Sequence, residues 1–119
     1  MIPTIAPLTQ ADEWFNHQIV NTHAAVATSD HAWTEKAWFT LMRKDAQLQA
    51  SFGLGKYANR NVLDGFAGVQ RGTRQRTVRA SRVLAPRSQD LEVGPLRYEV
   101  LEPFKAIRLT CAENTAQPL

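Results

Sequence analysis

The sequence predicts an all-β protein whose strands form an antiparallel meander, and three observations support this class. Short segments with strand-like alternation follow one another from about residue 18 to residue 111. Only a few turn residues separate neighbouring segments, which favours antiparallel pairing of consecutive strands. No apolar period of helix length occurs between them. We expect about seven strands in a partial or nearly closed barrel, because a small closed barrel usually needs about eight.

The N-terminal residues are expected to lie outside this sheet. Residues 1–8 contain two prolines and predict an extended arm, and Thr9 can cap a single helical turn that leads into Trp14. We therefore divide the chain into an arm with an opening turn at 1–17 and a β-domain at 18–119. The short strand count predicts that this β-domain is truncated.

Turn residues mark the ends of the expected strands. These strands are 18–28, 35–43, 47–57, 62–70, 74–84, 96–102 and 105–111. Apolar and small residues alternate in the third strand, so one face should be buried and the other, with Gly53 and Gly55, nearly bare. Gly65 and Gly68 recur inside the fourth strand, where glycine suits a tight bend or the close approach of another group. The stretch 85–94 is expected to be the longest loop.

Composition and cysteine use narrow the class of protein. The chain has 119 residues, 44% of them hydrophobic and 21% charged, as expected of one folded domain. Its single Cys111 excludes an internal disulfide and a multi-cysteine zinc site, and we expect a buried, inert thiol. His17 and His23 would lie roughly 20 Å apart in an extended segment, too far to share one metal ion. We expect neither a metal nor a cofactor.

The first residues carry no targeting signal. The first 35 residues contain no Lys or Arg, and no apolar run is long enough for a signal peptide or a membrane span. We therefore expect a cytoplasmic protein.

Motifs for covalent catalysis and phosphate binding are incomplete in this sequence. Gly53-Leu54-Gly55-Lys56 lacks the remaining residues of a phosphate loop and the helix that should follow it. A general acid needs no motif, because a carboxyl group inside an apolar barrel has a raised pKa. Asp64 is our candidate, since it alternates with Val62 and Phe66. The alternative is that Asp64 bonds the backbone at a bulge or faces solvent.

The basic residues are concentrated in one part of the chain. No acidic residue occurs in 65–89, and this part contains Arg71, Arg74, Arg76, Arg79, Arg82 and Arg87. Such a patch could contact phosphates. However, sheets that bind single-stranded nucleic acids interleave bases with aromatic residues, and no aromatic residue lies between Phe66 and Tyr98. This favours a solvated strand face, or one covered by a partner segment, over nucleic-acid binding.

The aromatic residues gather in the first two thirds of the chain. Trp38, Phe52 and Phe66 are our candidates for the lining of an apolar ligand cavity, as small barrels often have. Ordinary core packing is the alternative for each of them.

The segment Asp12-Glu13-Trp14-Phe15, followed by a strand, the Trp38-Phe39 strand, a short turn and the glycine-rich strand, resembles the start of the AttH-type, lipocalin-like family. That family includes carotenoid 1,2-hydratases (hydroxyneurosporene synthases), which carry a Glu-Trp-Trp-Tyr-like motif at the start of the first barrel. The stretch from Asp12 to about Pro118 also resembles the N-terminal part of longer bacterial proteins of this kind.

The resemblance implies that the chain holds most of the first of two lipocalin-like barrel domains and none of the second. It implies a structural role at the barrel opening for Glu13, Trp14 and Phe15, and it places the family's catalytic acid in a later region. We expect binding of an apolar small molecule such as an isoprenoid or a fatty acyl chain. Two alternatives are acid-catalysed hydration or isomerisation of a polyene or terpenoid in a full-length relative, and an interaction module whose open barrel edge pairs with a second copy or a missing domain.

Overall fold

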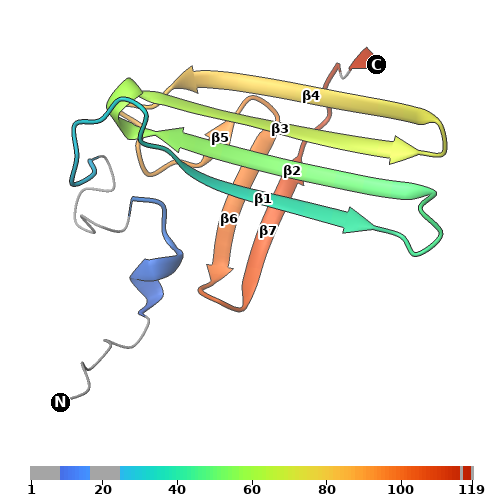
Figure 1. Cartoon of the computed structure of the whole chain (residues 1–119), viewed down its shortest axis with the longest axis horizontal. Helices are drawn as coiled ribbons and strands as arrows, with labels where there is room; N and C mark the ends of the chain where they lie inside the picture. Colours follow the sequence, from blue (N-terminus) through green and yellow to red (C-terminus); the bar gives the residue numbers. More distant parts are fainter. Residues whose placement is uncertain (1–8, 17–24, 116, 119) are drawn as a thin grey trace.

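The computed structural model describes residues 9–16, 25–115 and 117–118. In this part of the chain the strands form two antiparallel sheets (Figure 1). The larger sheet has the order β1-β2-β3-β4-β8 and consists of β1 (Glu35–Met42), β2 (Leu48–Tyr57), β3 (Val62–Arg71), β4 (Arg74–Val83) and β8 (Gln117–Pro118). The smaller has the order β5-β6-β7 and consists of β5 (Glu92–Val93), β6 (Leu96–Glu102) and β7 (Ala106–Cys111). The all-β, antiparallel prediction is therefore confirmed.

Two tight connections fix the register of the three central strands. β2 is joined to β3 by a one-turn 3-10 helix, η3 (Ala58–Arg60), and by Asn61, whose φ is 58°. Gly72, with a φ of 56°, joins β3 to β4. Both connections use a left-handed residue of the kind that suits Asn or Gly, and the strands then pair without interruption along their whole length.

The hydrophobic core lies between the two sheets. Strands β6 and β7 cross one face of the larger sheet at a steep angle (Figure 1), and we call this the inner face. The buried apolar side chains of the core are Phe15, Phe52, Leu54, Leu63, Leu84, Leu91, Val93, Leu96 and Tyr98. Phe52 and Leu54 are only 7% and 2% exposed, which confirms the buried face predicted for β2. None of the other described strands packs on the opposite, outer face of the larger sheet.

The barrel is partial, because the two sheets do not close on each other within the described residues. Six of the predicted strands correspond to β1 to β4, β6 and β7, with ends that agree to within one residue. The short strands β5 and β8 were not predicted, and β5 lies in the stretch 85–94 that was expected to be a loop.

The predicted first strand at 18–28 is wrong for residues 25–28, which form no strand, while residues 18–24 lie outside the described part. Side-chain hydrogen bonds replace strand pairing here, because the Asn59 amide donates to the carbonyl oxygens of Thr28 and Asp30, each at 2.8 Å. The prediction of a buried Cys111 is also wrong: this thiol is exposed, since it ends β7 at the margin of the smaller sheet.

The predicted opening turn is confirmed as the 3-10 helix η1 (Gln10–Glu13). The Asp12 carboxylate accepts a hydrogen bond of 2.6 Å from the Thr9 backbone N–H and so caps the turn. The Glu13 carboxylate accepts a hydrogen bond from the backbone N–H of Phe104, in the turn between β6 and β7. The Glu13 contact joins η1 to the smaller sheet. The expected arm at 1–8 lies outside the described residues.

Candidate functional site

Two rows of side chains cross the open outer face of the larger sheet. The strand register aligns Trp38, Gly53, Phe66 and Arg79 in one row, and Lys36, Gly55, Asp64 and Ser81 in the next. Because paired residues project to the same face of a sheet, both rows lie on the outer face.

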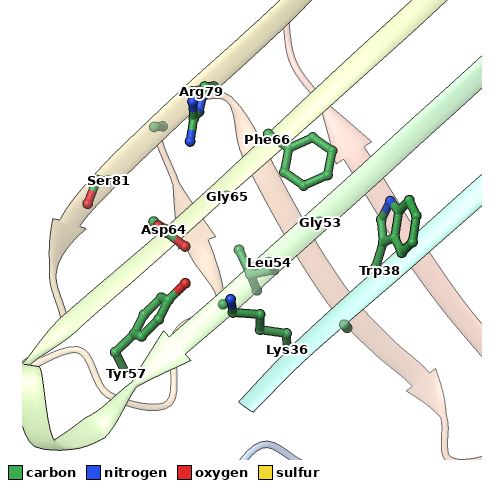
Figure 2. A pocket seen from close by; sticks show the side chains of 13 residues that line it. Lys36, Trp38, Gly53, Leu54, Tyr57, Asp64, Gly65, Phe66, Arg79 and Ser81 are labelled. Atoms are coloured by element: carbon green, nitrogen blue, oxygen red, sulfur yellow. The ribbon is translucent and has the colours of Figure 1, made fainter. Parts of the chain in front are cut away.

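These rows line a groove with a volume of about 660 Å³ (Figure 2). Its floor is the backbone of β2 at Gly53 and Gly55. The Phe66 ring lies over Gly53, since an added Cβ there would be only 2.3 Å from the Phe66 Cε1 atom. An added Cβ at Gly55 would be 3.0 Å from Asp64 Oδ1. The two glycines are therefore needed because neighbouring side chains lean across them.

Polar groups from several strands converge on the groove. Lys36 Nζ lies 5.3 Å from the centre of the Tyr57 ring, within cation–π range. Asp64 is half-buried, and Arg79 and Ser81 are exposed. Among the described residues, no ion pair includes Lys36, Asp64 or Arg79, although several surface cations elsewhere are paired. These charged groups are therefore available to a ligand.

The structure brings together three of the four residues that sequence reasoning selected. Trp38, Phe66 and Asp64 all line the groove. Phe52 does not, because it faces the core on the inner side of the sheet. Asp64 lies in a groove on one face of a sheet, and the described residues do not enclose it in the apolar barrel that was expected.

Sequence reasoning missed Lys36, Tyr57, Arg79 and Ser81 as groove residues. A usable signal was present in the strand lengths. With both β2–β3 and β3–β4 joined by short turns, the register follows from counting outward from each turn. That count places Tyr57, Arg79 and Ser81 on the face of Phe66, and counting from the short β1–β2 turn places Lys36 there too.

A second unusual feature, also missed, is the buried Lys56 on the inner face. Its side chain is 1% exposed, and burial lowers the pKa of the amine to about 8, while the nearby Glu35 opposes this shift. The Glu35 carboxylate also accepts a hydrogen bond of 2.6 Å from the Asn16 backbone N–H. Lys56 lines a small cavity of about 150 Å³ beside Trp14 and Phe15. Alternation along β2 could have placed Lys56 on the same face as Phe52 and Leu54.

The arginines of β4 do not form one basic face. Arg79 lies on the outer face, whereas Arg74, Arg76 and Arg82 alternate with it and belong to the inner side. Arg82 is directed to backbone carbonyl oxygens of the segment that leads into β5. Arginines that are close together in the sequence therefore lie on opposite faces of the sheet.

No group of three or more His, Cys, Asp or Glu side chains among the described residues is arranged to hold a metal ion. No helix in this part of the chain has the length and apolar character needed to cross a membrane.

The fold and the groove define an all-β domain of two packed antiparallel sheets, with an aromatic-lined groove on the outer face of the larger sheet. The chain belongs to a family of unknown function (DUF8625), whose model matches residues 8–117. Neither the curated proteins nor the solved structures contain a match to this chain.

Proposed function

We propose that this chain is a binding domain for an apolar small molecule of the isoprenoid or fatty acyl class, held in the outer-face groove. The observation that carries the proposal is the pair Trp38 and Phe66, which flank the Gly53 backbone in a hollow of about 660 Å³. This volume lies within the range of small-molecule sites, which combine an apolar lining with a few polar groups that orient the ligand.

The exposure of Trp38 supports this proposal. Its side chain is 70% exposed, an unusual position for so large an apolar group. Covering about 100 Å² of its ring would contribute about 2.5 kcal/mol at about 25 cal/mol per Å². That energy corresponds to an affinity gain of roughly 70-fold, before the costs of binding are subtracted.

Titration with retinol, followed through the ligand's own fluorescence, tests the proposal. We expect saturable binding, and we expect Trp38→Ala to weaken it by about tenfold or more. Met42→Ala is the matched control, because Met42 is 59% exposed on the same strand and face but lies outside the groove. If neither retinol nor a fluorescent fatty acid binds saturably, the proposal is contradicted. If Trp38→Ala and Met42→Ala lose the same affinity, the ligand does not bind in the groove.

A second candidate function is acid catalysis on a polyene or terpenoid. The observation that favours it is the Asp64 carboxyl group, which reaches over Gly55 beside Tyr57 in the same groove. In this reaction the carboxyl proton would pass to one carbon of a double bond, and water or loss of a neighbouring proton would complete hydration or isomerisation. Asp64→Asn should then abolish turnover and leave retinol binding intact, whereas unchanged turnover removes Asp64 from the mechanism.

The kinship with AttH-type, lipocalin-like proteins, the origin in a longer two-barrel protein and the cytoplasmic location stay predictions. Each fits the proposed binding of an apolar ligand.

A further inference from the structure

Strand β1 has the properties of a pairing edge. It ends the strand order of the larger sheet, so in the described structure it pairs with β2 alone. Three of its large apolar side chains are mostly exposed: Trp38 at 70%, Leu41 at 69% and Met42 at 59%. Leu41 lies on the inner face and the other two on the outer face. An edge strand that is apolar on both faces favours pairing with another strand.

The hydrogen-bond pattern shows which backbone groups of β1 are directed to the free edge. The Arg43 N–H donates to the Leu48 carbonyl oxygen at 2.9 Å, one step beyond the Met42–Gln49 pair. Hydrogen-bonded pairs alternate in an antiparallel ladder. The backbone groups that are directed away from β2 therefore belong to Lys36, Trp38, Thr40 and Met42.

The other edges carry features that oppose pairing. The outer edge of β4 is partly covered by β8, which pairs with Arg76 and Thr77. The outer edge of β7 carries the exposed Arg108 and a polar stretch toward its end. Charged edge residues and short covering strands are the usual protection against edge-to-edge association. Among the described strands, β1 combines the most exposed apolar side chains with a long free edge.

We propose that two copies of this chain pair through β1, antiparallel about a two-fold axis at Phe39, and join their larger sheets into one. The free backbone groups belong to even-numbered residues, so hydrogen-bonded pairs must join an even residue to an even residue. The register that uses the whole strand pairs Lys36 with the partner's Met42 and Trp38 with the partner's Thr40.

This register is chemically self-complementary. It places no like charges opposite each other: Glu35, which accepts a hydrogen bond from the Asn16 N–H, lies opposite the partner's Arg43, which is already paired with Asp45 of its own chain. On the inner face it also places Ala37 opposite the partner's Leu41, and Phe39 opposite its own copy. On the outer face the two Trp38 side chains become diagonal neighbours, within reach of each other. A second copy therefore covers the apolar side chains that β1 exposes on both faces.

Light scattering and sedimentation velocity of the full chain test the proposal. We expect a dimer that Leu41→Lys weakens by about tenfold or more, because the two-fold symmetry introduces the charge at two positions of the seam. Leu101→Lys is the matched control, since Leu101 is 50% exposed but lies on β6. A strictly monomeric chain at millimolar concentration, or a dimer that both variants leave intact, overturns the proposal. Equal urea midpoints for the two variants show that the fold is preserved.

The register has its own test in a Cys111→Ser background. Residues 37 and 41 face each other as a non-hydrogen-bonded pair, with Cα atoms about 4.5 Å apart, which a disulfide can bridge. The double variant Ala37→Cys, Leu41→Cys should form a covalent dimer under mild oxidation, and neither single variant should. A double variant that dimerises without forming a cross-link overturns the proposed register.

Discussion

Replacement of Arg82 by methionine is expected to cost more stability than any other arginine substitution on β4. Among the described residues, the guanidinium of Arg82 donates hydrogen bonds to backbone carbonyl oxygens and to no carboxylate. Its acceptors are the carbonyl groups of Val83, Leu84, Arg87, Asp90 and Glu92. One side chain therefore holds the segment between β4 and β5, which supplies Leu84 and Leu91 to the core. Arginine suits this role because its fork of N–H donors is planar and always charged.

The expected magnitude follows from how many of these bonds are shielded from water. The bonds to Leu84, Asp90 and Glu92 are part-buried, and those to Val83 and Arg87 are exposed. Water can replace the guanidinium at exposed carbonyl groups. Each shielded bond contributes about 1 kcal/mol, so Arg82→Met should lower the free energy of unfolding by about 3 kcal/mol. That is a large part of the roughly 5–15 kcal/mol typical of a domain.

Urea unfolding, followed by circular dichroism, measures this difference. Arg82→Lys should give an intermediate loss, because an ammonium group keeps the charge but reaches fewer carbonyl groups. Arg79→Met is the control on the same strand, since Arg79 is exposed and its loss should change stability by no more than about 0.5 kcal/mol. If Arg82→Met and Arg79→Met shift the midpoint equally, the carbonyl contacts of Arg82 do not hold the segment and the reasoning is refuted.

The remaining predictions concern buried ionisable groups and the groove floor. Burial lowers the pKa of Lys56 to about 8, so the unfolded chain binds more protons above this pH. The free energy of unfolding should therefore rise from pH 8 toward pH 10 in urea titrations. If a Lys56→Met variant keeps this rise, a group other than Lys56 causes it. Burial raises the pKa of Tyr98 to about 12, so stability should fall above pH 10, and Tyr98→Phe should reduce the fall. Gly53→Ala should lower the free energy of unfolding by about 1–3 kcal/mol, because the added methyl group clashes with the Phe66 ring. If Gly53→Ala costs as much in a Phe66→Ala background, this clash is not the cause.

Local pattern predicted the strands well because alternation and turn residues are encoded within a few neighbouring positions. β2 shows this: Phe52 and Leu54 face the core, and Gly53 and Gly55 face the outer side, where neighbouring side chains lie over them. The same pattern could not show what lies against each face, since that depends on strands β6 and β7, which follow much later in the sequence. The candidate cavity therefore combined residues from both sides of one sheet, with Phe52 in the core and Trp38 in the groove.

The burial of Lys56 is the clearest case of tertiary context overriding residue type. A lysine near the end of a strand is ordinarily a solvent-exposed residue. Here η1 and the residues after it bring Phe15 and Asn16 over the inner face, and the Asn16 N–H bonds to Glu35, the cross-strand partner of Lys56. This arrangement requires a contact between the N-terminal segment and β1, which no periodicity within β2 contains.

Trp38 takes part in both proposals, so its exposure alone cannot decide between ligand binding and pairing through β1. Leu41 separates them, because it is 69% exposed on the inner face, where the groove cannot reach it. A ligand in the groove leaves Leu41 uncovered, whereas a second copy covers both side chains. Leu41→Lys should therefore weaken pairing by about tenfold or more and leave retinol affinity within about twofold, since the groove lies on the other face of β1. A parallel loss of both properties would instead mean that the partner's β1 completes the binding site.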